Sequence, residues 1–215
     1  WRDAELVDVG KTGYGPATSQ ARINGLLVDK VRAGLRVCRL KGGDPLIFGR
    51  GGEEAEELHD AGIPFEFVPG ISSSIAGPAY AGIPVTHRDH CSQLTIFTGH
   101  EDPTKAESSM DYAQIAKAPG TKVMLMGVER LPHVTAAILK EGGDPKLPVA
   151  LVRWATTGRH RTITGTLATI AKVAEKADFK APAVAVFGTV VKYRKKLNWF
   201  EKRPLRGKRI VVTRT

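Results

Sequence analysis

The stretch VCRLKGGDPLIFGR, residues 37–50, decides the predicted fold, because a short apolar strand runs directly into a Gly-Gly-Asp-Pro turn. Paired glycines at the end of a buried strand let the backbone itself approach a ligand closely. Asp44 adds a carboxylate that can accept hydrogen bonds from hydroxyl or amine groups, and Pro45 ends the strand. The acidic run at 53–57 favours a helix N-terminus after the turn. An ordinary strand-to-helix loop would show the same spacing, so both interpretations stay open at this point.

Strand and helix patterns alternate along the rest of the chain, which predicts an α/β fold. The expected strands are residues 5–9, 36–40, 65–68, 94–98, 122–126, 149–153 and 183–187. The expected helices are residues 19–33, 53–61, 72–81, 131–140 and 167–177. The polar run 101–111 has no apolar period and predicts a surface loop. We place the boundary between two subdomains, 1–90 and 91–200, near residues 89–91, and expect a linker from residue 201.

The composition indicates a globular protein. The chain has 215 residues, of which 42% are hydrophobic and 25% are charged, so it can bury a substantial core. No apolar run approaches the length of a membrane span, and we therefore expect no membrane partner. Cys38 and Cys91 are too few for a disulfide framework, which favours a reducing, cytoplasmic location.

The chain is strongly basic, with a formal net charge of +10. Half of the residues from 192 to 209 are Lys or Arg. A solvated linker surface would explain this run, and so would electrostatic steering of a substrate that carries many carboxylates. Aromatic residues are not interleaved with base-reading polar residues here, so we expect no nucleic-acid partner.

Two common site types are excluded by spacing. A phosphate-binding loop ending at Gly10-Lys11 would need glycine at position 5, where Glu5 stands, and no dinucleotide-binding glycine fingerprint occurs. His87, His90 and Cys91 follow no common zinc spacing, so we expect no metal site.

Longer motifs carry a resemblance to a known family. RLKGGDPLIFGRGGEEAEEL (39–58), followed by GIPFEFVPGISSSIAGPAYAGIPVTHRD (62–89), is similar to the tetrapyrrole methylase family. Five further motifs follow the family's order and spacing: VDVGKTG, FTGHE, VMLMG, LVRWATTGRHRTITGTL and PAVAVFGTVVKYRKKLNWF. Together they cover nearly the whole chain. The resemblance implies an α/β fold of two subdomains, with the cofactor and substrate cleft between them.

The resemblance also implies an activity. Members of this kind transfer methyl groups from S-adenosylmethionine to carbons of uroporphyrinogen III, giving precorrin-2 for sirohaem or cobalamin synthesis. The reaction displaces a good leaving group, so in-line positioning should contribute most of the catalysis. A sister methylase acting on a later cobalamin precursor is the nearest alternative. A tetrapyrrole-binding module that serves a fused synthase is an alternative from another class.

The resemblance carries over to particular residues. Lys11 matches the family's acid/base lysine, although a lysine there could equally bind a propionate. The expected cofactor contacts are Gly42, Gly43, Asp44, Ile47, Ser72, Ser73, Met126, Ala155 and Thr156. Taken without the family, the two serines would be helix N-caps and the methionine would belong to a core. From charge and position, Arg39, Arg50 and Arg88 are expected to face substrate carboxylates.

The resemblance also predicts which parts of the family pattern lie at the two ends of the chain. The family's first strand, its Gly-Pro-Gly-Asp loop and a Tyr-Asp pair with the proposed catalytic base are expected to lie before Trp1. RPLRGKRIVVTRT (203–215) resembles the first strand of uroporphyrinogen-III synthase. We therefore expect a fragment of a fused protein, inactive without the missing aspartate, and a homodimer as in the family.

Overall fold

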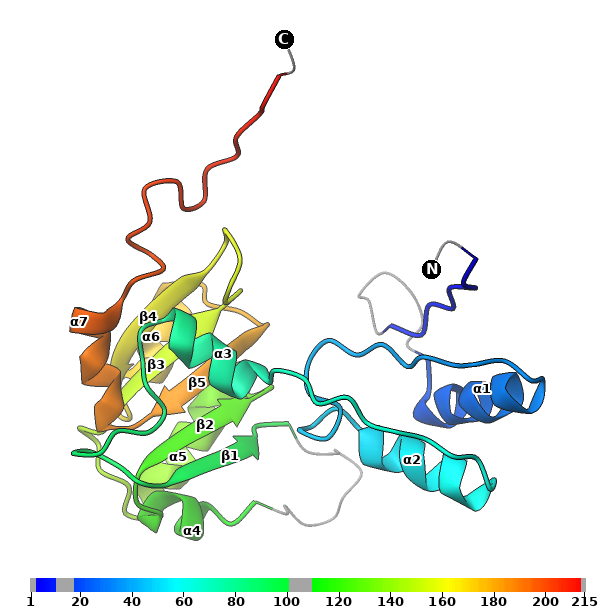
Figure 1. The fold of residues 1–215 in the computed structure, drawn as a ribbon. Coiled ribbons are helices and arrows are strands. Elements are labelled where there is room, and N and C mark those ends of the chain that lie inside the picture. Colours follow the sequence, from blue (N-terminus) through cyan, green and yellow to red (C-terminus); the bar gives the residue numbers. More distant parts are fainter. Residues whose placement is uncertain (1–2, 11–17, 101–109, 214–215) are drawn as a thin grey trace. The chain divides into compact units, whose positions relative to one another are not determined.

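The chain forms two compact units, seen in a computed structural model that describes residues 3–10, 18–100 and 110–213. The units are Trp1–Ile71 and Ser72–Thr215 (Figure 1). The division falls before residue 72, whereas the sequence pattern placed it near residues 89–91. The reason is that helix α3 (Ser73–Tyr80) packs against three strands of the second unit, so it belongs to that unit's core.

The first unit contains two helices that pack on each other, α1 (Gln20–Arg32) and α2 (Gly51–Asp60). Ser19 caps α1, since its side chain accepts a hydrogen bond from the Arg22 backbone N–H at 3.3 Å. Both helices match the predicted segments to within two residues at each end. Helix α2 begins at Gly51 because Arg50, with a φ of 60°, turns the chain through the left-handed region.

The prediction of strands in the first unit, at 5–9, 36–40 and 65–68, is wrong. No strand is assigned among residues 3–10 and 18–71. Leu6, Leu40 and Val68 are 93%, 84% and 77% exposed, so these segments do not bury an apolar face. An apolar pattern favours a strand, but a ladder also needs a partner for its backbone N–H and C=O groups. These segments have no ladder partner in the described part of the unit.

The second unit is built on a five-stranded sheet with the order β1-β2-β5-β3-β4. The strands are β1 (Leu94–Thr98), β2 (Thr121–Leu125), β3 (Pro148–Arg153), β4 (Arg161–Thr166) and β5 (Ala183–Phe187). Strand β1 is parallel to β2, and the other three pairs are antiparallel. The structure confirms the four predicted strands to within one residue. It adds β4, whose RTITGT sequence is too polar to stand out.

The strand period separates two hydrophobic cores, because alternate side chains point to opposite faces of a sheet. Met124, Leu151 and Phe187 pack on one face with helices α4 (Tyr112–Lys117), α5 (Leu131–Lys140) and α6 (Ile170–Lys176). Val123 and Val186 pack on the other face, with residues that follow α3 and with the 3₁₀ helix η1 (Thr189–Tyr193). The sheet is therefore covered on both sides, which holds the ends of its strands in place.

The last regular element is α7 (Arg194–Leu197), and residues 208–213 follow it as an irregular, exposed segment. The strand expected there is not formed in the described residues. Within the described ranges, no helix is both long and apolar enough to span a membrane.

Candidate functional site

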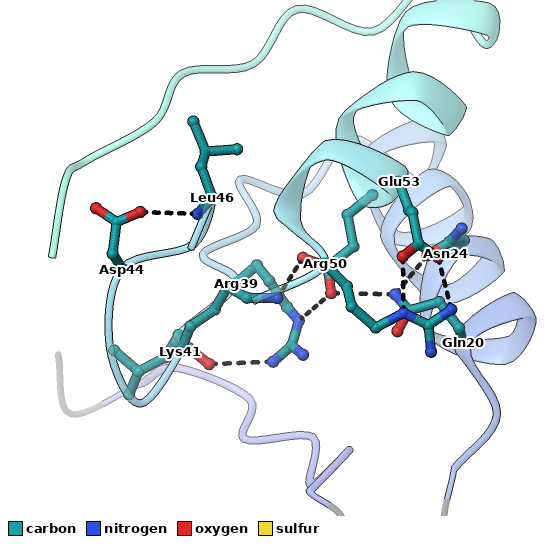
Figure 2. A network of polar contacts seen from close by, with 10 residues as sticks. Gln20, Asn24, Arg39, Lys41, Asp44, Leu46, Arg50 and Glu53 are labelled. Atoms are coloured by element: carbon teal, nitrogen blue, oxygen red, sulfur yellow. Dashed lines mark hydrogen bonds and ion pairs between the residues drawn. The ribbon is translucent and has the colours of Figure 1, made fainter. Parts of the chain in front are cut away.

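The Gly-Gly-Asp-Pro turn is held by the side chain of Asp44. Its Oδ1 accepts hydrogen bonds from the backbone N–H groups of Leu46 (2.9 Å, Figure 2) and Ile47 (3.2 Å), and its Oδ2 accepts one from Gly70 at 3.0 Å. The Gly70 and Leu46 bonds lower the pKa of Asp44 below its usual value of 3.8. A carboxylate has about four acceptor positions, so these three bonds leave about one for a ligand.

Glycines around this turn stand where a side chain would not fit. A Cβ on Gly70 would lie 2.5 Å from the Gly43 carbonyl oxygen, and one on Gly51 would lie 2.6 Å from that of Pro45. By contrast, Gly42 is exposed and has open space beside it. The turn is therefore packed tightly on its inner side and presents bare backbone on its outer side, as close approach by a ligand requires.

Behind the turn, Glu54 of α2 forms a buried polar cluster. Its side chain is 6% exposed and lies 2.8 Å from Lys41 Nζ and 3.1 Å from Arg39 Nε. Gln20 Nε2 donates to Glu54 Oε1 at 3.2 Å and to Asn24 Oδ1 at 2.9 Å (Figure 2). Burial alone would raise the pKa of Glu54, but the hydrogen bonds from Lys41, Gln20 and Arg39 outweigh it and lower that pKa.

The arginines expected to face substrate carboxylates have different surroundings. Arg39 is paired with Glu54, and its guanidinium also donates to the Leu40 carbonyl at 3.0 Å. Arg50 forms a two-point pair with Glu53, at 2.9 and 2.6 Å. Arg88 is exposed in the second unit. Lys11 lies outside the described residues.

In the second unit, the expected cofactor residues gather at one edge of the sheet. Strands β1, β2 and β3 all run in the same direction, since β5 is antiparallel to both β2 and β3. Met126 directly follows β2, and Ala155 and Thr156 follow β3. Because β5 lies between them, the ends of β2 and β3 are about 10 Å apart. Open α/β sheets bind ligands at such carboxyl ends.

The backbone at this edge is unusual. Met126 and Thr156 have φ values of 55° and 70°, in the left-handed region that non-glycine residues seldom adopt. Met126 is also 55% exposed, so it is not the core residue that its type alone would suggest. Such conformations concentrate at functional sites.

Helix α3 brings the two predicted serines to the second unit. Ser72 is its N-cap and accepts a hydrogen bond from the Ser74 N–H at 3.2 Å, while Ser73 is exposed. The helix packs closely on the second unit at Gly77, where a Cβ would lie in ordinary van der Waals contact with Val184 (3.5 Å) and Ala155 (3.9 Å). The capping interpretation of Ser72 is confirmed, and Ser73 is the serine that stays open to a ligand.

The ends of β1 and β2 touch through two glycines. A Cβ on Gly99 would collide with the Cα of Gly127 and would lie 2.9 Å from Met124 Sδ. The Gly99 N–H donates to the carbonyl of Leu125, the last residue of β2, at 2.8 Å, which extends the ladder one residue past the end of β1. This close backbone contact sets the path of the chain immediately beside Met126.

A second buried cluster ties the chain after α7 to β4. The His160 side chain is fully buried, and its Nε2 lies 2.9 Å from Thr162 Oγ1 and 3.1 Å from Glu201 Oε1. Arg194 pairs with Glu201 Oε2 at 2.5 Å, and Arg206 donates to the His160 carbonyl. Burial lowers the pKa of His160, against the attraction of Glu201.

This cluster predicts a pH dependence of stability. Since the folded pKa of His160 lies below its usual value of 6.5, the unfolded chain binds the proton more readily. The free energy of unfolding should therefore fall as pH drops below about 6.5, by up to about 1.4 kcal/mol per pH unit. Chemical denaturation from pH 7.5 to 5 would measure this. His160→Gln should flatten the slope and His59→Gln, at an exposed position, should not; equal slopes in both would contradict the assignment.

Sequence reasoning missed Glu54, although a signal for it was present. The acidic run at 53–57 was interpreted as favouring a helix N-terminus, without distinguishing its members. Gly51, Glu54, Ala55 and Leu58 have the i, i+3, i+4, i+7 spacing of one helix face, and the first three are buried. A glutamate on that face predicts a buried ion pair. No group of three or more His, Cys, Asp or Glu side chains suited to a metal occurs within the described ranges.

Comparison with known proteins gives consistent results. The sequence profile of the Tetrapyrrole (Corrin/Porphyrin) Methylases matches residues 4–171. An S-adenosyl-L-methionine-dependent uroporphyrinogen III methyltransferase from Methanosarcina barkeri is 53% identical over 188 residues, which are 87% of this chain and 74% of the relative. The uroporphyrinogen-III C-methyltransferase of Bacillus subtilis is 41% identical over 98% of this chain. The match spans only 43% of that relative's length.

A solved structure extends the similarity to three dimensions. It is the uroporphyrin-III C-methyl transferase from Thermus thermophilus complexed with S-adenyl homocysteine. The two chains superpose with a TM-score of 0.70 at 36% identity, covering 80% of this chain and 74% of the other. With the family profile matching well over half of its residues, the chain belongs to the tetrapyrrole methylase family.

Proposed function

We propose that the protein transfers methyl groups from S-adenosylmethionine to carbons of uroporphyrinogen III, giving precorrin-2. The observation that carries the proposal is the 53% identity over 188 residues to a relative named for this cofactor and this substrate. The Thermus thermophilus structure, which holds the demethylated cofactor at 36% identity, supports the same cofactor.

The local structure fits a nucleoside cofactor. In the first unit, the exposed backbone at Gly42 permits close approach, and Asp44 keeps about one acceptor position for a hydroxyl or amine group. In the second unit, Ser73 and Met126 are exposed. We assign cofactor contacts to all nine predicted positions: Gly42, Gly43, Asp44, Ile47, Ser72, Ser73, Met126, Ala155 and Thr156.

Methyl transfer from this cofactor depends more on positioning the two reactants than on activating the methyl group. S-adenosylmethionine supplies a methyl group on a sulfonium, which leaves readily. The protein's contribution is to hold that methyl in line with a pyrrole carbon and to manage one proton. We assign proton transfer to Lys11, whose ammonium can exchange protons near neutrality when it is partly desolvated.

The substrate's carboxylates suit the charge of the chain. A net charge of +10 attracts a polyanion and raises the rate of encounter. Arg39, Arg50 and Arg88 are the proposed carboxylate contacts. Because Arg39 and Arg50 are already paired with Glu54 and Glu53, a substrate carboxylate would have to compete with those glutamates. Arg88, which is exposed, would face less competition.

Three further features stay predictions: a homodimer, a cytoplasmic location and a fused uroporphyrinogen-III synthase. The chain spans less than half the length of the Bacillus subtilis relative, so the activity of the whole protein remains part of the proposal.

An anaerobic assay tests the proposal directly. The full-length protein would be incubated with uroporphyrinogen III and S-adenosylmethionine, and the tetrapyrrole identified by mass and absorbance. A product two methyl groups heavier than the substrate is expected. An unchanged tetrapyrrole with bound cofactor would indicate a sister methylase. Retained porphyrin binding without S-adenosylhomocysteine binding would indicate a tetrapyrrole-binding module.

A further inference from the structure

The chain segment that leads into the Gly-Gly-Asp-Pro turn is held from one side by a single buried carboxylate. No strand is assigned to residues 35–41, so a backbone ladder does not fix this segment in the described part of the unit. Two of its side chains, Arg39 and Lys41, instead converge on Glu54 at 3.1 and 2.8 Å. Lys41 is the residue directly before Gly42.

Glu54 also joins this segment to both helices of the first unit. It belongs to α2, and Gln20 of α1 donates to the same Oε1 that accepts from Arg39. Gln20 is itself tied to Asn24, one turn further along α1. The carboxylate therefore connects α1, α2 and the turn at one point. Figure 2 labels its partners Gln20, Arg39 and Lys41.

The side-chain carboxylates of Asp44 and Glu54 thus hold opposite ends of the turn. Asp44 fixes the residues that follow the turn, by accepting hydrogen bonds from Leu46, Ile47 and Gly70. Glu54 fixes the residues that enter it, through Arg39 and Lys41. Without Glu54, two cations would face each other with no anion between them, and their repulsion would move the segment.

We propose that Glu54 is a positioning residue for cofactor binding, acting through Lys41 and Arg39 on the backbone of Gly42 and Gly43. This inference rests on the proposed function, since it takes those glycines as cofactor contacts. Glu54 itself is buried behind the turn and does not touch the cofactor. It acts by keeping the glycine backbone in the conformation that the ligand meets.

The test compares Glu54→Gln with Glu57→Gln, a matched change at an exposed glutamate of the same helix. Calorimetry with S-adenosylhomocysteine should show a dissociation constant raised about ten-fold or more in Glu54→Gln, because the ligand would then have to order a glycine backbone that is no longer preorganised. In the full-length protein, KM for S-adenosylmethionine should rise while kcat falls less. Glu57→Gln should resemble the wild type in both measurements.

A purely structural role would give a different result. Partial unfolding lowers the active fraction, and so lowers apparent kcat while KM stays unchanged.

If Glu54→Gln does not fold, Lys41→Met provides the second variant, because Arg39 and Gln20 still partner the carboxylate. It should also weaken S-adenosylhomocysteine binding. Because both changes act on one ion pair, the double variant should lose less affinity than the sum of the two single losses.

Each failure has its own signature. A wild-type protein that does not bind S-adenosylhomocysteine would overturn the proposed function and this inference with it. A wild type that binds, together with folded Glu54→Gln or Lys41→Met variants that bind equally well, would overturn only the role of Glu54.

Discussion

Asp44→Ala should weaken S-adenosylhomocysteine binding by about 10- to 100-fold, because a hydrogen bond from the ligand to a charged carboxylate contributes about 1.5–3 kcal/mol. The change removes the acceptor of three backbone N–H groups, those of Leu46, Ile47 and Gly70. The turn would lose its link to Gly70, which lies 26 residues further along the chain. Isothermal titration with S-adenosylhomocysteine measures the effect.

The control for this change is Asp60→Ala, at an exposed aspartate near the end of α2, which should bind like the wild type. Because the pKa of Asp44 lies below 3.8, its carboxylate stays charged above that pH. Its contribution to binding is present at neutral pH and is lost only as pH falls through the lowered pKa. Asp44→Ala binding at wild-type strength would show that the turn keeps its shape without the carboxylate.

Gly99→Ala should destabilise the second unit and weaken cofactor binding at the same time. The new methyl would collide with the Cα of Gly127, which is backbone and cannot rotate away. Overpacking of this kind costs about 3 kcal/mol at the upper end of its usual range. For a chain of this size that corresponds to a fall in Tm of roughly 6–12 °C. Thermal denaturation followed by circular dichroism measures it.

Gly25→Ala is the matched control for Gly99→Ala. Gly25 lies within α1 and has nothing within 4 Å of the position of a Cβ. Alanine there should raise stability by about 1 kcal/mol, the difference in helix propensity. Since Met126 follows β2 next to Gly127, only Gly99→Ala should also reduce S-adenosylhomocysteine affinity. An unchanged Tm for Gly99→Ala would mean that the two strand ends separate without loss.

Local patterns predicted the second unit well. Strands at 94–98 and 183–187 and the helix at 131–140 are found with the predicted bounds. Their side chains repeat with the period of the element that they form, and the sheet then divides them between two cores. The same reasoning missed β4, because its polar sequence has no strand pattern and the strand forms by pairing with β3.

The first unit shows why apolar patterns are insufficient. Residues 36–40 have the composition of a strand, yet no ladder is assigned to them, and Leu40 remains 84% exposed. Pairing depends on a second segment, and the pattern of one segment does not contain that information. The helices of this unit were predictable because each satisfies its own backbone hydrogen bonds.

The sequence by itself determined the family, five of the helices, four strands of the sheet and the Gly-Gly-Asp-Pro turn, since each depends on neighbours along the chain. Only the tertiary structure decided that Arg39 and Lys41 are the partners of the buried Glu54. It alone showed that Gly99 and Gly127 touch, and that His160 meets Glu201. These contacts join residues 13 to 41 positions apart. They cannot be predicted from the sequence, because local propensity carries no information about which distant side chains share a buried space.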